Sequence, residues 1–326
     1  MSKHRRIFKQ DEFKELGFGN KVVESNQRLM NKDGSSNVKR TGLAFYESTN
    51  FYHELITMPW LKFIALLLLF YISVNFIFAG IYFAVDPDHI GGMIYTNTRE
   101  KFNEIFFFSA QSLTTVGYGR LNPTSTFNSA LAAFESMAGL LGFALATGLL
   151  YGRFSRPVAR ILFSKNAIVA PYKGFTALMV RIANKNKSEL LDPEATIVFS
   201  YVSTETGSEV RKFSTLKLEI THVTLLTMSW TIVHPIDEES PIYGWTIEDF
   251  KTRQVEFLCL IKAYEETFAQ TVHARSSYRG EEVEFGVKFF PLIKPGEKNS
   301  VTVELNKISD IIVAPLFEEI NSSDPK

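Results

Sequence analysis

The sequence predicts a membrane α-helical module with two spans and a re-entrant helix, followed by a C-terminal all-β sandwich of the immunoglobulin-like class. Three observations lead to this fold class. Residues 63–85 carry no charged side chain, and residues 127–151 carry only Glu135. A shorter apolar stretch lies between these two runs. From about residue 158 onward, period-two alternation and frequent turn residues replace the long apolar runs.

The residues before the first span divide into two segments. Residues 1–46 are polar throughout and lack the apolar core of a signal peptide, so we expect an irregular cytoplasmic segment. Residues 47–61 place apolar side chains at helical spacing, reach Pro59 and then carry Trp60. This pattern favours a short amphipathic helix that lies on the membrane surface, a slide helix. An ordinary solvated helix is the alternative.

The transmembrane domain is expected to cover residues 62–152, with its outer helix at residues 62–85. Within that helix, Phe63 to Val85 form a run of 23 uncharged residues. At 1.5 Å per residue the run covers about 34 Å, enough to span the hydrocarbon core of a bilayer. Asn75 lies inside it, and a polar side chain at that depth is expected to face protein rather than lipid.

Two further helices are expected in this domain. Residues 102–114 are apolar but too few to cross a bilayer, so we expect a re-entrant helix there. Residues 126–152 are expected to form the second, inner spanning helix. Its many Gly, Ala and Ser residues permit close helix packing around an axis.

Lys and Arg residues are distributed unevenly around the two spans. Residues 1–62 carry eleven, whereas residues 86–126 carry three. Four more follow the second span: Arg153, Arg156, Arg160 and Lys165. Because cytoplasmic segments are enriched in these residues, we expect both termini in the cytoplasm and the re-entrant segment outside.

The remainder of the chain, residues 153–326, is expected to form a cytoplasmic β-sandwich domain with a regulatory role. Ile197–Tyr201 and Leu216–Ile220 alternate with period two, as half-buried strands do. The sequence contains no GxGxxG or P-loop motif, so a Rossmann-type nucleotide sensor is not expected.

Composition argues against several function classes. The chain has 35 basic and 35 acidic residues, a balance unlike that of proteins that bind nucleic acid. A single cysteine, Cys259, and six scattered histidines show no metal-ligand spacing. No nucleophile–base arrangement is visible either. We therefore expect no enzyme activity, no organic cofactor and no nucleic-acid partner.

The stretch SLTTVGYGR, residues 112–120, follows the re-entrant helix. Gly117 and Gly119 can adopt positive φ without steric cost, alternating with Val116 and Tyr118 at negative φ. The backbone carbonyls of residues 115–118 would then point the same way and replace the water oxygens around a cation. The Thr115 hydroxyl would add an inner ring. One strand forms only one wall of such a cage, so the pattern predicts four identical chains around an axis.

The motif TTVGYG after a Phe-rich helix resembles the potassium-channel selectivity filter. Other strings make the chain similar to inward-rectifier potassium channels, specifically their bacterial branch, over about residues 30–310. These strings are DGSSN at 33–37, FYHEL at 51–55, RFSRP at 153–157, SWTIVHPID at 229–237 and HARSSY at 273–278. The resemblance implies a homotetramer in the bacterial inner membrane that conducts K⁺ passively and is blocked by Ba²⁺. It also implies K⁺ bound at Thr115, Val116, Gly117, Tyr118 and Gly119.

The resemblance also implies roles for residues of the inner helix. Gly139 matches the hinge glycine of the family, although simple close packing is an equal alternative. Phe143 lies where strongly rectifying relatives carry an acid that holds polyamines and Mg²⁺, so we expect weak rectification. Tyr151 matches the bulky residue that closes the bundle crossing, with an interfacial anchor as the alternative. Independently of the resemblance, Glu135 is the only acid in this span and is expected at the cavity, level with the filter. It could pair with a group of the re-entrant helix or shape the field of the cavity, and structural support for the filter is the favoured role.

Basic residues near the membrane suggest a lipid site. Lys62, Arg153 and Arg156 form a juxtamembrane collar, and such charges attract anionic headgroups at about 1 kcal/mol each. A role in topology alone is the alternative. The resemblance implies inhibition by phosphoinositides in bacterial relatives and activation in eukaryotic ones, and the sequence leaves the sign open for this chain.

Two departures from the family pattern carry expectations of their own. Relatives commonly have an acid directly after GYG, where this chain has Arg120. Four such charges would lower the local K⁺ concentration, so we expect Arg120→Asp to raise inward conductance at low ionic strength. The residues 263–266 are expected to form a loop that aligns with the cytoplasmic constriction of the family, with Ala263 and Tyr264 as gate residues. Relatives with a glycine there have more backbone freedom, so Ala263 puts the mobility of this gate in doubt.

Gating by protons is one possibility, because His234 and His273 can titrate near neutrality. A structural role is the more common one for such residues. A secondary transporter would need internal repeats and broken helices, which two spans do not supply. A non-conducting receptor remains an alternative, although it leaves the filter spacing unexplained.

Overall fold

The computed structural model describes residues 28–38, 42, 50–156, 159–186, 188–203, 209–296 and 300–316. The chain forms two compact units. One contains Thr41–Arg156 and is called the membrane unit below. The other contains Met1–Arg40 and Pro157–Lys326 and is called the β unit.

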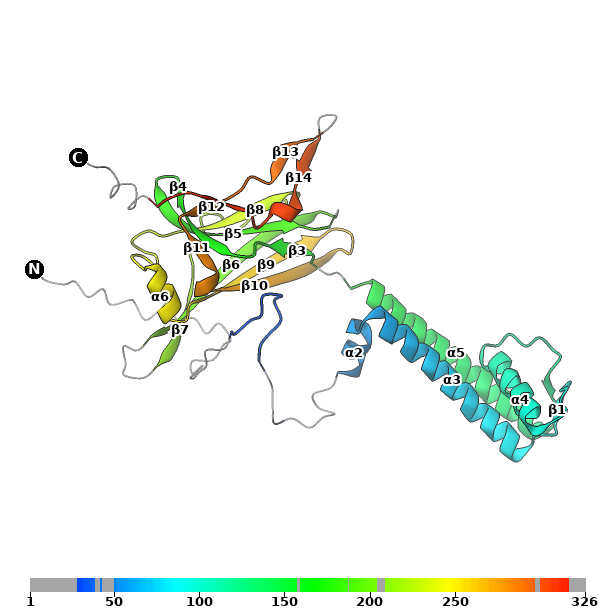
Figure 1. Cartoon of the computed structure of the whole chain (residues 1–326). Coiled ribbons are helices and arrows are strands. Elements are labelled where there is room, and N and C mark those ends of the chain that lie inside the picture. Colours follow the sequence, from blue (N-terminus) through cyan, green and yellow to red (C-terminus); the bar gives the residue numbers. More distant parts are fainter. Residues whose placement is uncertain are drawn as a thin grey trace, which may run out of the picture. The chain divides into compact units, whose positions relative to one another are not determined.

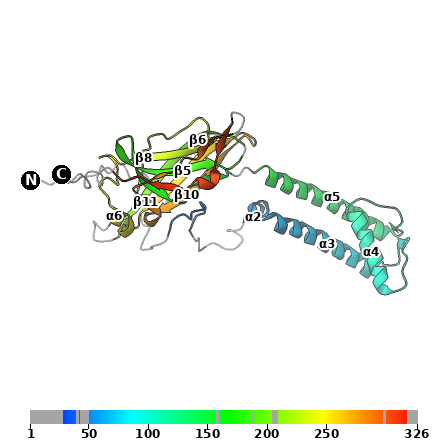
Figure 2. The same cartoon turned by 45° about the horizontal axis from the view of Figure 1, so that its top comes forward.

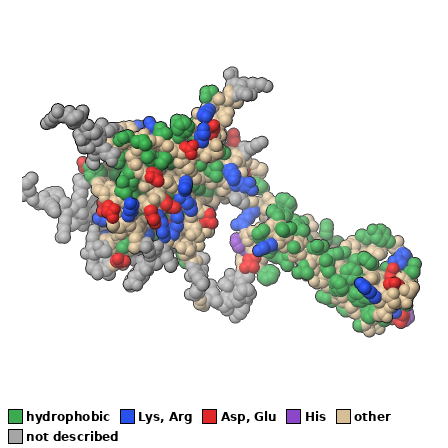
Figure 3. Space-filling model, viewed as in Figure 1, with side chains coloured by type: hydrophobic (Ala, Val, Ile, Leu, Met, Phe, Trp, Pro, Cys, Tyr) green, Lys and Arg blue, Asp and Glu red, His purple; other side chains and the backbone are tan. Residues whose placement is uncertain are grey.

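The membrane unit is built from four helices: α2 (Phe51–Thr57), α3 (Trp60–Val85), α4 (Thr98–Leu113) and α5 (Thr126–Phe154). Helices α3 and α5 are long and apolar enough to cross a membrane. Helix α4 lies beside both of them in Figures 1 and 2. Hydrophobic side chains cover the visible face of this unit between charged residues near its two ends (Figure 3). The apolar exterior of α3 and α5 fits a lipid environment.

The helix boundaries differ from those expected. Helix α4 begins at Thr98 rather than 102, because the Asn97 side chain caps it by accepting the Glu100 N–H at 2.9 Å. That polar first turn carries no apolar signal. Helix α5 runs to Phe154, two residues past the expected end. With 16 residues α4 remains too short to span a bilayer.

Helix α2 is shorter than the expected segment 47–61. Asn50 caps it by accepting the His53 N–H at 3.1 Å, and it ends at Thr57. A new helix then begins at Trp60, directly after Pro59. Residues 47–49 of the expected segment, and most of residues 1–46, lie outside the described residues.

The β unit is a sandwich of two sheets. One sheet has the order β10-β9-β6-β7 and the other β11-β4-β5-β3, with β8 also paired to β5. The strands are β3 (Ile161–Phe163), β4 (Ala167–Tyr172), β5 (Phe175–Asn184), β6 (Leu190–Ser203), β7 (Val210–Thr215), β8 (Ser229–Pro235), β9 (Glu256–Glu265), β10 (Gln270–Arg279) and β11 (Val283–Phe285). Shorter pairs are formed by β12 (Val287–Phe289) with β15 (Ile311–Val313) and by β13 (Ile293–Pro295) with β14 (Val301–Val303). The main core contains residues of both sheets, such as Leu178, Val180, Ile197 and Phe257, all fully buried. The expected all-β sandwich is thus present.

One expected strand was wrong. Residues 216–220 form no strand, and the chain bends at Glu219. The Leu216 N–H bonds Ile197 O in one sheet, whereas the Glu219 N–H bonds Val233 O in the other. Leu216 and Leu218 are buried between the sheets. The alternation therefore reflects a crossing from one sheet to the other, which buries Leu216 and Leu218 without forming a ladder and leaves Ile220 exposed.

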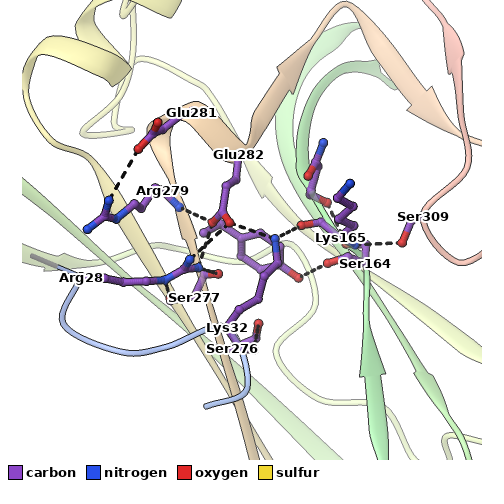
Figure 4. A network of polar contacts seen from close by, with 12 residues as sticks. Arg28, Lys32, Ser164, Lys165, Ser276, Ser277, Arg279, Glu281, Glu282 and Ser309 are labelled. Atoms are coloured by element: carbon purple, nitrogen blue, oxygen red, sulfur yellow. Dashed lines mark hydrogen bonds and ion pairs between the residues drawn. The ribbon is translucent and has the colours of Figure 1, made fainter. Parts of the chain in front are cut away.

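The segment 28–38, part of the expected irregular cytoplasmic segment, packs onto the β unit. Met30 is buried with Val198 and Leu258. Arg28 pairs with Glu282 at 2.8 Å, and Lys32 reaches the same carboxylate at 3.1 Å (Figure 4). This part of the N-terminal region therefore belongs to the fold of the β unit.

Candidate functional site

The chain from α4 into residues 115–119 has alternating backbone conformations. Thr115, Gly117 and Gly119 have φ of 57°, 53° and 84°, whereas Val116 and Tyr118 are not among the positive-φ residues. The sequence predicted the two glycines but not Thr115, a β-branched residue for which this region costs roughly 1–2 kcal/mol. Hydrogen bonds from the Thr115 N–H to Ser112 O and from the Val116 N–H to Gln111 O hold the segment to the end of α4.

Alternating φ of this kind is compatible with carbonyls that point to one side, the arrangement by which carbonyl oxygens coordinate a cation. The segment is an open surface of the single chain, with Val116 52% and Tyr118 80% exposed. Helix α4 ends directly before it, so the negative end of the helix dipole lies at its start.

The inner helix α5 packs tightly against the end of α4. A Cβ on Gly139 would lie 1.8 Å from the carbonyl oxygen of Leu113. The Ser136 hydroxyl donates to the carbonyl of Ser112 at 3.0 Å. Gly139 was expected as a hinge, with close packing as the alternative. The contact with Leu113 shows that close packing alone requires glycine at this position.

Glu135 joins the three helices around the segment. Its side chain is fully buried, and it accepts hydrogen bonds from the Tyr82 hydroxyl of α3 at 2.9 Å and from the Ser109 hydroxyl of α4. Ser109 also lies 3.2 Å from the Asn75 side chain, which is buried as expected. The sequence indicated Glu135 and Asn75. Tyr82 and Ser109 carried no signal beyond being polar residues in apolar helices.

Arg120 directly follows residues 115–119 and is bonded to two other parts of the membrane unit. Its guanidinium pairs with Glu104 of α4 at 2.6 Å and donates to Gly92 O at 3.0 Å. Two short strands, β1 (Ile90–Gly91) and β2 (Asn122–Pro123), pair beside it. Sequence reasoning treated Arg120 as an unpaired positive charge and missed Glu104, the only acid in residues 102–114. The pairing neutralises much of the charge on which that expectation depended.

The candidate cavity and gate residues lie on α5. Phe143 and Tyr151 are each 73% exposed in the single chain, so neither is held by packing within it. The other gate candidates lie in β9. Ala263 pairs with Val272 and is buried in the sandwich core, whereas its neighbour Tyr264 is 40% exposed. Ala263 is therefore placed in a regular ladder rather than in a mobile loop.

The three collar residues differ in their surroundings. Lys62 and Arg156 are exposed. Arg153 instead donates to Leu55 O at 2.5 Å and to Met58 O at 2.6 Å, at the end of α2. Its guanidinium also lies over the rings of Trp60 and Phe63, at 4.6 and 4.4 Å from their centroids. Arg153 thus connects α2, α3 and α5.

The two histidines considered for proton gating also differ. His234 is buried and hydrogen-bonded through both ring nitrogens, to Lys217 O at 2.7 Å and to Ser240 at 2.8 Å. Burial lowers its pKa, so the neutral ring is favoured near neutrality. His273 lies exposed on β10. His234 is therefore a structural residue in the described fold.

Comparisons with known proteins agree with this geometry. Residues 161–320 match the family "Inward rectifier potassium channel C-terminal domain", and residues 70–156 match the family "Ion channel". The chain is 36% identical to the inward rectifier potassium channel Kirbac3.1 of Paramagnetospirillum magnetotacticum, over 90% of this chain and 98% of that protein. It is 26% identical to the human ATP-sensitive inward rectifier potassium channel 15, over 88% of this chain and 83% of that protein. It is 25% identical to the mouse ATP-sensitive inward rectifier potassium channel 12, over 94% and 78%. The chain therefore belongs to the inward rectifier potassium channel family and is a membrane protein, not an enzyme.

Proposed function

We propose that the chain forms a homotetrameric, K⁺-selective channel that conducts passively across the bacterial inner membrane, with both termini in the cytoplasm. The observation that carries the proposal is the alternation of φ at residues 115–119 at the end of α4. Carbonyls turned to one side can replace the hydration shell of K⁺, and no organic cofactor enters this chemistry. The distribution of Lys and Arg supports the orientation.

The proposal of four copies is supported by the incompleteness of one. A single segment supplies one wall of each ion site, and closure needs rotational symmetry about the conduction axis. The exposed apolar residues of α5, including Leu140, Phe143 and Tyr151, are consistent with a face that other copies cover. The contacts of Glu135, Ser136 and Gly139 then fix each wall to its own helices.

Gating is proposed at Tyr151, where four phenol rings around the axis would exclude water, and at the cytoplasmic domain near Tyr264. Phe143 carries no charge, so polyamines and Mg²⁺ gain no Coulomb attraction there and rectification is weak. Anionic phospholipid headgroups act through Lys62 and Arg156, whose exposed charges are available to them. Arg153 acts beside them by holding the end of α2.

A flux assay tests the proposal directly. The purified chain is placed in liposomes loaded with K⁺, and uptake of a tracer cation is followed with and without external Ba²⁺. A matched set of liposomes is loaded with Na⁺ instead. We expect Ba²⁺-sensitive uptake with K⁺ inside and little uptake with Na⁺ inside. Uptake that is equal with both ions contradicts K⁺ selectivity. If neither the wild type nor Tyr151→Ala takes up the tracer cation, a non-conducting receptor is favoured.

A further inference from the structure

A cavity of about 300 Å³ lies in the β unit, away from every residue assigned above to conduction. It is formed where α6 (Ile247–Thr252) meets β7, the start of β9 and the turn η2 (Gly280–Glu282) after β10. Its lining residues are Arg211, Phe250, Lys251, Gln254, Val255, Glu256, Arg279, Gly280 and Glu281. A Cβ on Gly280 would lie 2.1 Å from Phe250 O, so the backbones of η2 and α6 are in close contact beside the cavity.

The lining carries three cationic side chains, Arg211, Lys251 and Arg279, against two carboxylates. Arg211 is almost completely buried, with a side chain 5% exposed, and its nearest carboxylate oxygen belongs to Glu256 at 3.8 Å. Glu256 also accepts the backbone N–H groups of Leu29 and Met30 at 3.0 and 3.2 Å. Its negative charge is therefore shared among several donors.

The second carboxylate, Glu281, is far more exposed than Glu256. Glu281 lies 3.6 Å from Arg279 (Figure 4), and its side chain is 70% exposed, so water screens the pair. Lys251 forms no ion pair within the part of the chain that the structure describes. The three cationic and two carboxylate side chains of the lining therefore leave a surplus of one positive charge in the cavity.

The charged neighbours of Arg211 and its burial act on the pKa of its guanidinium. Burial lowers the pKa of this guanidinium, and the like charge of Arg279 lowers it further, while Glu256 acts in the opposite direction. Arg211 and Arg279 both line this partly enclosed space, and an anion bound between two guanidinium groups is favourable for both. Arg presents forked N–H donors that suit the tetrahedral oxygens of phosphate.

We propose that this cavity binds a small phosphate-bearing anion through Arg211, Arg279 and Lys251. Its volume is at the small end of the range for ligand pockets, which run from roughly 300 to 1,000 Å³. Phosphate or pyrophosphate is small enough for this volume. The same chemistry belongs to a soluble phosphate compound and to a phosphorylated lipid headgroup.

Occupancy of the cavity is coupled to the N-terminal segment through Glu256. This carboxylate lines the cavity and also holds the backbone of Leu29 and Met30. An anion that draws Arg211 toward itself leaves Glu256 free to bond those N–H groups more strongly. The bound anion is therefore expected to slow amide exchange in residues 28–38.

Binding is measured on the purified full-length chain in detergent and does not depend on conduction. Pyrophosphate is titrated while tryptophan fluorescence and the melting temperature are recorded, because Trp245 lies with its ring 6.2 Å from that of Phe250. The test variant is Lys251→Glu, an exposed change that leaves the core intact. The control is Lys288→Glu, an exposed lysine of β12 that does not line the cavity. A parallel titration uses vesicles of neutral lipid with and without a phosphoinositide.

We expect saturable binding of pyrophosphate that is weakened at least tenfold by Lys251→Glu and unchanged by Lys288→Glu, together with slower exchange in residues 28–38. This result assigns the cavity to a soluble phosphate compound. A response to phosphoinositide vesicles alone, lost in Lys251→Glu only, assigns it to a lipid headgroup. Absence of both responses, or equal weakening in both variants, overturns the proposal.

Discussion

Gly139 illustrates how one backbone contact constrains a residue with two candidate roles. Its missing Cβ leaves room for the carbonyl oxygen of Leu113, which a Cβ would approach to 1.8 Å. Gly142, one turn further along α5, has no atom within 4 Å of the same position. The two glycines therefore separate packing from helix flexibility, because alanine stiffens the helix equally at both.

We expect Gly139→Ala to destabilise the protein by about 1–3 kcal/mol, the usual cost of forced overpacking. Gly142→Ala should be neutral or stabilising by up to about 1 kcal/mol, since alanine favours a helix. Thermal unfolding followed by circular dichroism measures both. If the Gly139→Ala protein has the melting temperature of the wild type but its channel opens less often, Gly139 acts as a hinge.

Arg120 leads to a different expectation from the one that its charge alone suggested. Because Glu104 lies 2.6 Å away, Arg120→Asp places two carboxylates together and frees the loop held at Gly92. We expect lower K⁺ over Na⁺ selectivity in the flux assay rather than higher conductance. The exchange Arg120→Glu with Glu104→Arg should recover much of the selectivity. If Arg120→Asp instead raises inward conductance and leaves selectivity unchanged, the charge of Arg120 acts by lowering the local K⁺ concentration.

The backbone conformations of residues 115–119 were predictable from the sequence only in part. Gly117 and Gly119 at positive φ were predictable, because only glycine adopts that region without steric cost. Thr115 was not predictable, since its conformation depends on hydrogen bonds from the segment back to Ser112 and Gln111. Pairs such as Arg120 with Glu104 depend on the path of the intervening loop, which charge patterns do not specify.

At the scale of elements, Arg153 holds α2 against the start of α3. Two hydrogen bonds to backbone carbonyls and two aromatic rings engage its guanidinium, whereas Arg156 is exposed. We expect Arg153→Gln to speed amide exchange in α2 on the order of tenfold, which equals a loss of about 1.4 kcal/mol. Arg156→Gln should leave that exchange unchanged and weaken the response to anionic lipid. Equal amide exchange of α2 in both variants would contradict the role of Arg153 in holding α2.

The docking of segment 28–38 depends on pH through Glu282. Burial opposes ionisation of this carboxyl, but the Arg279 N–H and the side chains of Arg28 and Lys32 outweigh it and lower its pKa. A lowered folded-state pKa gives stability that is present above the unfolded value and is lost as pH falls through the folded one. We therefore expect amide protection of residues 28–38 near pH 7, lost below about pH 4.

Glu282→Gln provides the control for this titration. The variant should show weak protection of residues 28–38 at every pH and a flat profile. Glu284→Gln changes a carboxylate that bonds Asn166 instead, and it should retain the wild-type profile. A pH dependence that survives in Glu282→Gln would place the titrating group elsewhere.

Element boundaries were less predictable than element types. Two spans, a re-entrant helix and a sandwich follow from hydrophobic periodicity, which records how each element is buried. The start of α4 is instead fixed by a side-chain cap at Asn97, and polar capping residues look like loop in a hydrophobic pattern. The strand predicted at residues 216–220 was wrong because a segment that crosses between sheets can alternate in burial as a strand does.

On the scale of the whole molecule, the membrane unit and the β unit each bury a separate core. A change in one unit is therefore expected to leave the fold of the other intact. Tyr151 is suited to a test of gating for this reason. Its ring is 73% exposed in the chain, so its removal takes little packing from the fold of a single copy.

We expect Tyr151→Ala to raise Ba²⁺-sensitive tracer uptake on the order of tenfold, which corresponds to about 1.4 kcal/mol in favour of the open state. Four smaller side chains no longer exclude water from the crossing, so the closed state loses its apolar plug. Leu145→Ala is the matched control, since Leu145 is 71% exposed on the same helix and is not assigned to the gate. If both variants raise uptake equally, loosening of α5 rather than the loss of a plug explains the change. If Tyr151→Ala leaves uptake at the wild-type level while the protein still binds Ba²⁺, the constriction lies elsewhere along the pathway.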